Sequence, residues 1–176
     1  MHPPNVYLRK AAPKDEDRIH ELLCVPEVFE YLADDEAPSR TITSEWILSA
    51  ASDSDHYPGG LWLLVIENEN ECAGVVKLAG DETKELELTY ILDPRVWGRG
   101  YATRMAHSIM IHAFEEGRTA QIWAGADLPN TRSFGVMKRL GMQFRRKVEY
   151  PMGAGMEFEI TSKQFDPFRF EPLPIR

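Results

Sequence analysis

The sequence predicts a mixed α/β domain of the α+β type, built on one mixed, mostly antiparallel sheet of six or seven strands with helices on both faces. Two observations predict it. Three strand-like runs follow one another between residues 61 and 92, separated by turn residues, as in an antiparallel meander. A strand–helix–strand pattern over residues 85–126 then indicates a crossover within the same sheet. We expect one domain over residues 1–165, because 176 residues suffice to bury a core, and a Pro-rich tail over 166–176.

The elements before residue 60 are short. In order we expect a strand at Val6–Arg9, a helix opened by Ala12–Asp15 and ending near Leu22 and Leu23, a short helix over Pro26–Tyr31 and a helix over Glu45–Ala51. Acidic residues in the first turn favour the first helix, and Thr43 or Ser44 can cap the last one. Between them, Asp34, Asp35 and Glu36 form an acidic loop.

The central strands are expected at Leu61–Ile66, Cys72–Leu78 and Glu85–Leu92. The first is continuously apolar, as in a strand that is covered on both faces. The third alternates polar and apolar residues, so one of its faces meets the core.

After residue 92, helices and strands alternate. We expect a helix whose apolar stripe runs from Ala102 to Phe114 and which ends at Gly117, a strand at Ala120–Ala126, a helix over Asn130–Leu140, and a hairpin of Phe144–Tyr150 and Met156–Ser162. Apolar side chains at three- and four-residue steps predict the first of these helices. Asn130 suits the N-cap of the second helix and Gly141 its end.

The turn between the strand at Glu85–Leu92 and the next helix points to a phosphate site. It contains Gly98 and Gly100, and a helix start leaves several N–H groups without an acceptor. Those donors and the helix dipole favour a bound pyrophosphate, so we expect a phosphorylated cofactor. The third glycine of a dinucleotide-binding GxGxxG is absent, since Thr103 stands there, and no P-loop occurs. Taken alone, the two glycines are also compatible with a tight turn.

Three features together resemble the GNAT acetyltransferase superfamily, in particular its ribosomal-protein N-terminal acetyltransferase branch. They are the run Arg95-Val96-Trp97-Gly98-Arg99-Gly100-Tyr101-Ala102, which matches the family pattern of Arg or Gln, two residues, Gly, one residue and Gly or Ala; the preceding Tyr90-Ile91-Leu92-Asp93-Pro94; and Asn130-Thr131-Arg132-Ser133 followed by Leu140-Gly141-Met142. The resemblance is strongest from Glu85 to Phe144 and weak before Leu61.

The resemblance implies acetyl-CoA as the acyl donor. Its pyrophosphate would lie on the main chain of Gly98, Arg99, Gly100, Tyr101, Ala102 and Thr103, and Arg95 and Arg99 would add positive charge. Its pantetheine arm would pair with main-chain groups of Ile91 and Leu92 like an added strand, and the Leu92 N–H would polarise the thioester carbonyl. Asn130 would cap its helix, hydrogen-bond the pantetheine amide, or do both.

The resemblance also implies direct acetyl transfer to a primary amine, which a base must first deprotonate. Glu87 is our candidate base and Glu85 the alternative, although both also fit the solvent face of an alternating strand. Met137 stands where many superfamily members carry a tyrosine acid, so Ser133 or Tyr101 would take that role. A thiol with a pKa of about 8.5 is also a fair leaving group without help.

The acceptor would be a peptide N-terminus, an amino acid or a small amine. The acidic loop at 34–36 could attract it, and we expect Trp46, Tyr57, Trp62 or Tyr150 in the wall of its pocket, with core packing the safer assignment for Trp62. A non-catalytic acyl-CoA sensor on the same fold and the transfer of a longer acyl group are the alternatives.

Composition limits the other partners. A formal net charge of −8 argues against nucleic acid as the main partner. The two cysteines and five histidines have neither a disulfide nor a metal-ligand spacing, so we expect no metal. No apolar run approaches a membrane span and the first residues do not resemble a signal peptide, so we expect a cytoplasmic protein. The terminal hairpin and the tail residues Phe165, Phe168 and Phe170 could support a homodimer.

Overall fold

A computed structural model describes residues 5–32, 38–52, 60–67, 71–80, 85–116, 119–151 and 153–176. Its strands are β1 (Val6–Lys10), β2 (Gly60–Ile66), β3 (Glu71–Gly80), β4 (Glu85–Leu92), β5 (Gln121–Asp127), β6 (Gln143–Tyr150) and β7 (Gly153–Thr161). Its α-helices are α1 (Glu16–Leu23), α2 (Pro26–Phe29), α3 (Arg40–Ser52), α4 (Tyr101–Glu115) and α5 (Thr131–Arg139), with 3₁₀ turns η1 (Pro13–Asp15) and η2 (Pro94–Val96).

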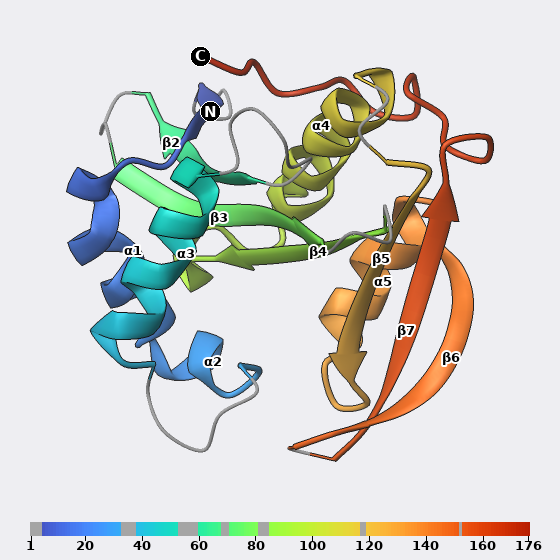
Figure 1. Ribbon diagram of the computed structural model, residues 1–176, viewed down its shortest axis with the longest axis horizontal. Coiled ribbons are helices and arrows are strands. Elements are labelled where there is room, and N and C mark those ends of the chain that lie inside the picture. Colours follow the sequence, from blue (N-terminus) through green and yellow to red (C-terminus); the bar gives the residue numbers. More distant parts are fainter. Residues whose placement is uncertain are drawn as a thin grey trace.

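The seven strands form one sheet in the order β1-β2-β3-β4-β5-β7-β6. All neighbours are antiparallel except β4 and β5, which are parallel because α4 carries the chain across the sheet between them. Helices α1 to α3 cover one face of the sheet and α4 and α5 the other (Figure 1). The predicted α+β architecture, with a mostly antiparallel sheet of six or seven strands, is therefore confirmed.

The core has two parts, one on each face of the sheet. Ile19, Leu23 and Ile47 of the first helices pack on one face, and Met105 and Ile109 of α4 pack on the other. Strand β2 is buried along its whole length, because its alternate side chains enter the two parts in turn. This explains why its sequence is apolar without alternation.

The helix predicted over Glu45–Ala51 begins earlier, at Arg40. Neither predicted cap lies at its start: Thr43 is fully buried inside the helix, and the Ser44 hydroxyl donates to Glu16 Oε1 at 2.7 Å and to the Arg40 carbonyl at 3.0 Å. Three predicted features, the acidic loop at 34–36, Tyr57 and Gly117, lie outside the described residues.

The tail at 166–176 packs on the body of the protein as an irregular extended segment. It crosses α4 and ends beside β1 (Figure 1), where Leu8 N–H donates to the Pro174 carbonyl at 2.7 Å and Arg176 N–H donates to the Leu8 carbonyl at 2.8 Å. Leu173 is buried in the core, whereas Phe168 is 92% exposed. The tail thus covers part of the outer edge of the sheet at β1.

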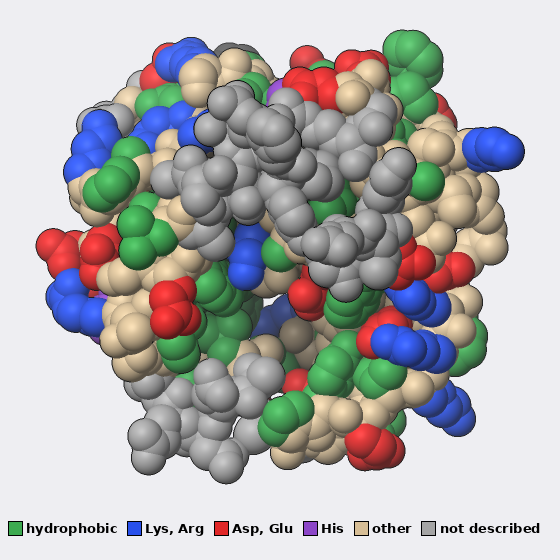
Figure 2. All heavy atoms as spheres, viewed as in Figure 1, with side chains coloured by type: hydrophobic (Ala, Val, Ile, Leu, Met, Phe, Trp, Pro, Cys, Tyr) green, Lys and Arg blue, Asp and Glu red, His purple; other side chains and the backbone are tan. Residues whose placement is uncertain are grey.

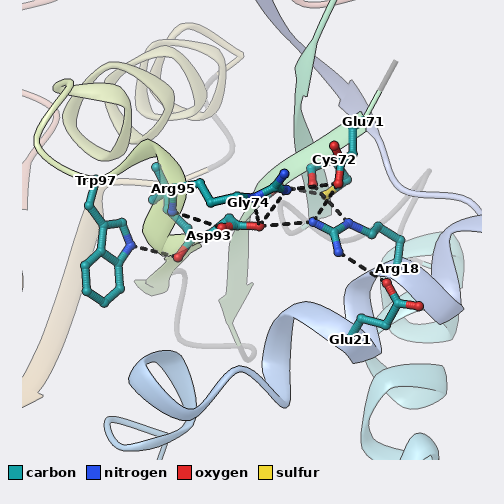
Figure 3. Close-up of polar contacts among 9 residues, drawn as sticks. Arg18, Glu21, Glu71, Cys72, Gly74, Asp93, Arg95 and Trp97 are labelled. Carbon is teal, nitrogen blue, oxygen red and sulfur yellow. Dashed lines mark hydrogen bonds and ion pairs between the residues drawn. The ribbon is translucent and has the colours of Figure 1, made fainter. Parts of the chain in front are cut away.

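A buried carboxylate ties the end of β4 to the first helix. Asp93, 6% exposed, accepts hydrogen bonds from the Arg95 main-chain and side-chain nitrogens and from Arg18 Nη2 at 3.1 Å (Figure 3). Glu71, at the start of β3, pairs with both arginines. Burial alone raises the pKa of Asp93, but the hydrogen bonds from Arg95 and the charges of both arginines outweigh it, so this pKa lies below its usual value.

Replacing Asp93 by Asn therefore lowers stability in a pH-dependent way. We expect Asp93→Asn to reduce the free energy of unfolding at pH 7 by about 1–3 kcal/mol, because hydrogen bonds to a charged group are lost. A depressed folded-state pKa stabilises only above the unfolded pKa of about 3.9, so the difference shrinks as pH falls below about 4. Urea unfolding between pH 3 and 7 measures it. The exposed Asp17, which pairs with Arg40 on the surface, is the control, and Asp17→Asn should change stability by less than about 0.5 kcal/mol. Equal effects of the two variants would contradict the expectation.

Candidate functional site

The site begins where β4 and β5 part. The two strands are in register only at Glu85–Gln121, Leu86–Ile122 and Glu87–Trp123, although β4 continues to Leu92 along β3 and β5 continues to Asp127 along β7. A cavity of about 1070 Å³ opens along this gap, walled by β4, β5, the starts of α4 and α5, and side chains of α2 and α3. Figure 2 shows the molecule hollowed between its two halves, with hydrophobic side chains on the walls.

The parting leaves main-chain groups of β4 without a sheet partner. Asp93 N–H donates to the Ala73 carbonyl at 2.9 Å, so residues in phase with Asp93 face β3 and the alternate ones face the gap. The main-chain groups facing the gap are those of Tyr90 and Leu92. Ile91 lines the cavity with its side chain, but its N–H and C=O face Val75 in β3, in contrast to the expectation that its main chain is open.

One of the open groups is already occupied. The Trp97 indole N–H donates to the Leu92 carbonyl at 2.8 Å (Figure 3), whereas neither Leu92 nor Tyr90 is paired with a residue of β5 in the described part of the chain. The gap therefore presents amide donors from an extended strand to whatever enters it.

The turn at the mouth of the gap is a cradle of open main chain. Gly98 and Gly100 have φ of +74° and +77°, a conformation that favours glycine, and a Cβ at either would meet no atom within 4 Å. Arg104 N–H makes the first helical hydrogen bond of α4, to Gly100, so the preceding amides of the first turn have no intrahelical acceptor. Tyr101, the first residue of α4, lines the cavity, and its buried hydroxyl has no hydrogen-bond partner among the described residues. These features fit a phosphate with an attached polar arm.

The positive charges at this mouth are not those expected. Arg95 is held by Asp93 and Glu71 and does not line the cavity, and Arg99 is exposed outside it. The cations on the cavity wall come from α5. The Arg132 guanidinium lies over the Trp97 ring at 4.5 Å from its centroid, and Arg139 Nε donates to Thr103 Oγ1 at 3.1 Å.

The spacing of Arg132 and Arg139 in the sequence could have indicated that they act together. Arg132 and Arg139 are seven residues apart in a helix that the sequence predicts, so they lie two turns apart on one face. Their common orientation toward the gap requires the position of α5 against the sheet.

Asn130 caps α5 and keeps its amide group available. Its Oδ1 accepts from Ser133 N–H at 3.2 Å, which confirms the predicted cap, and no described residue accepts from its Nδ2. Ser133 also lines the cavity, and its carbonyl accepts from the Tyr90 hydroxyl at 3.0 Å. Met137, in the position where a tyrosine was expected from the resemblance, is 1% exposed and belongs to the core.

Glu87 lies at the closed end of the gap, on the face covered by α1 to α3. The Glu87 side chain is exposed toward the cavity. Partial desolvation by the surrounding walls nevertheless raises the pKa of Glu87, the Lys77 charge lowers it and the Glu157 charge raises it further. Glu85 is separate from the cavity, because its carboxylate pairs with Arg145 at 3.0 Å. The two candidate bases thus differ in their access to the cavity.

Other side chains complete this half of the cavity. Trp46 and Tyr150 line it, as expected for an acceptor pocket, whereas Trp62 is buried and packs edge-on against His112 in the core. Other polar residues of the cavity wall include Glu27, Tyr31 and Asp127. Asp127 Oδ1 is buried without a hydrogen-bond partner, and burial raises the pKa of this carboxyl.

Among the described residues, no group of three or more His, Cys, Asp or Glu side chains is placed to hold a metal ion. No helix in the described part of the chain has the length and hydropathy needed to cross a bilayer.

Known proteins share this architecture. The chain is 25% identical over 109 residues to the uncharacterized protein YkkB of Bacillus subtilis. This alignment covers 60% of this chain and 63% of that protein. The ribosomal-protein-S5-alanine acetyltransferase of Vibrio fischeri superposes with a TM-score of 0.79 at 14% identity, over 95% of this chain and 98% of that one. The spermidine N-acetyltransferase of Vibrio cholerae, solved with CoA and spermine, superposes with a TM-score of 0.75 at 14% identity, over 91% and 97% of the two chains.

The likeness to these structures concerns the fold. The family is given by the sequence itself, because residues 5–143 match the model of the acetyltransferase (GNAT) domain. This range contains the parted strands, the glycine turn and Asn130. The chain therefore belongs to the GNAT acetyltransferase family.

Proposed function

We propose that this chain is an acetyl-CoA-dependent N-acetyltransferase that moves an acetyl group directly to a primary amine. The observation that carries the proposal is the row of unpaired main-chain donors that begins at the Gly98–Thr103 turn and continues along β4 at Leu92 and Tyr90. A linear molecule with a phosphate end and an amide-bearing arm satisfies such a row. In two neighbouring folds, the named substrates are a ribosomal protein and a polyamine.

Each part of the row has a task in this proposal. The turn holds the pyrophosphate, with Arg132 and Arg139 adding charge, and Asn130 Nδ2 donates to the pantetheine arm. Acetyl-CoA supplies the acetyl group as a thioester. Of the two open amides, the Tyr90 N–H lies nearer the closed end and is placed to hydrogen-bond the carbonyl oxygen on which negative charge develops. The Leu92 N–H, which the resemblance implied for this role, would meet the arm nearer the mouth.

Glu87 is the proposed base. Its carboxylate opens into the cavity, and its raised pKa makes it a better proton acceptor than an ordinary surface glutamate. Ser133 lines the same cavity and stays a candidate for a polar contact at the reacting end. The acceptor amine would enter between α2, α3 and the β6–β7 pair, where Glu27 and Asp127 favour an ammonium group.

Binding of the donor tests the glycine turn. We expect Gly100→Ala to weaken acetyl-CoA at least about 10-fold in isothermal titration, because the methyl group occupies the cradle and the backbone leaves its left-handed conformation. Gly141→Ala is the matched control, since Gly141 has φ of +86° at the end of α5, away from the cavity. It should retain affinity within about threefold of the wild type. Equal affinity of the Gly100 variant and the wild type would contradict the placement of the phosphate.

Turnover tests Glu87. With a panel of an alanine-first peptide, spermidine and an aminoglycoside, Glu87→Gln should lower kcat by about 10²- to 10⁴-fold while acetyl-CoA affinity is kept. The wild-type rate should rise with pH through the raised pKa of Glu87, because the base acts when deprotonated; the variant should lack this limb. Glu85→Gln should keep the wild-type rate and profile, since Glu85 pairs with Arg145 outside the cavity. Binding of acetyl-CoA without turnover of any amine in the panel would favour the alternative, a non-catalytic acyl-CoA sensor, for which the core position of Met137 is the supporting observation.

A further inference from the structure

The side chain of Tyr150 lies across the sheet over two glycines and reaches the closed end of the gap. Tyr150, the last residue of β6, lies over β7 and β5 rather than turning outward. A Cβ at Gly155 in β7 would lie 2.5 Å from two of its ring carbons, and a Cβ at Gly125 in β5 would overlap its hydroxyl. Only glycine leaves room for the ring at both positions, so the sequence of two other strands fixes where this hydroxyl lies.

The hydroxyl lies on the same face of the sheet as Glu87. Glu87 and Trp123 are partners at the last paired position of β4 and β5, so their side chains share a face, and Gly125 follows Trp123 by two residues. The hydroxyl over Gly125 is therefore beside the point where the gap closes. No described residue hydrogen-bonds to it, and Tyr150 lines the cavity.

An arm that enters from the glycine turn reaches this point with its far end. The phosphate cradle is at the open mouth of the gap, and the open main-chain groups lead from Leu92 to Tyr90 toward the closed end. The terminal atom of an extended arm is then the one closest to Glu87 and Gly125. In coenzyme A that atom is sulfur.

We propose that the Tyr150 hydroxyl donates a hydrogen bond to the thioester sulfur and stabilises the departing thiolate, in the role that Met137 is unable to fill. This inference rests on the proposed function. Tyr101, which the resemblance also suggested, is the first residue of α4 and directly follows the glycine turn, at the end of the gap assigned to the phosphate.

The step balances with Tyr150 keeping its proton. The Glu87 carboxylate takes a proton from the ammonium group of the acceptor, the amine forms the C–N bond, and the C–S bond breaks with its electron pair going to sulfur. The second amine proton and the proton held by Glu87 pass to solvent and to the released thiolate.

The charges around Tyr150 decide between donating a proton and donating a hydrogen bond. Burial, and then the negative charges of Glu157, Glu87 and Asp127, raise the pKa of Tyr150 to about 12, while Arg146 lowers it. A thiol has a pKa of about 8.5, so a phenol this weak retains its proton beside a thiolate. It is present as a hydrogen-bond donor throughout the neutral range.

Removing the Tyr150 hydroxyl alone tests whether it contributes to the rate of acetyl transfer. Tyr150→Phe should lower kcat about 10- to 100-fold, as expected for a hydrogen bond to a charged group, with unchanged affinity for acetyl-CoA. The control is Tyr7→Phe, which removes a hydroxyl far from the cavity and keeps the ring under Arg176. An unchanged kcat in Tyr150→Phe, or an equal loss in both variants, would overturn the assignment.

A binding measurement tests the contact without turnover. In protein labelled with ¹³Cζ-tyrosine, the resonance absent from Tyr150→Phe identifies Tyr150. CoA should shift it, and desulfo-CoA, which lacks only the sulfur, should bind but shift it much less. If both ligands bind and move this resonance equally or not at all, the sulfur contact is wrong while the proposed function stands. If neither ligand binds, the proposed function fails and this inference fails with it.

Discussion

The parting of β4 and β5 after Glu87 and Trp123 is the constraint on which the rest of the site depends. A strand that leaves its partner inside a protein exposes amide groups that must find other partners or remain costly. This protein itself supplies one hydrogen-bond partner to the open edge, because the Trp97 indole N–H donates to the Leu92 carbonyl. The N–H groups of Leu92 and Tyr90 are left, and so the gap has a preference for ligands that accept hydrogen bonds in an extended arrangement.

An open edge of this kind keeps its shape only if the end of the strand is held in place. Asp93 holds the end of β4, because its buried carboxylate accepts hydrogen bonds from the Arg95 N–H in the following turn and from Arg18 of α1. The same contact holds Arg95, so that its guanidinium does not line the cavity. The charge at the cavity mouth is instead provided by Arg132 and Arg139, from the other wall. Structural and ligand-facing arginines are thus divided between the two sides of the gap.

Local features of the site could be predicted from the sequence, and features that depend on strand order could not. Alternation of apolar residues placed β4 at Glu85–Leu92, and Asn130 marked the start of α5, because both signals act within a few residues. Periodicity says which face a side chain takes but not which edge of the strand is paired, so the choice between the main chains of Ile91 and Leu92 required the partner strand. The position of Tyr150 depends on Gly125 and Gly155 in two other strands, which no local pattern connects.

The charged side chains around Glu87 bear on its strength as the proposed base. The cavity wall carries Arg132 and Arg139 from α5, and also the acidic side chains of Glu27, Glu87 and Asp127. Negative neighbours help a cationic amine to enter, but they also stabilise its protonated form, which is unreactive as a nucleophile. Desolvation raises the pKa of Glu87, so that the proposed base competes better for the ammonium proton, and the Lys77 charge opposes this rise. Desolvation and the neighbouring cation thus act in opposite directions on the carboxylate that we propose as the base.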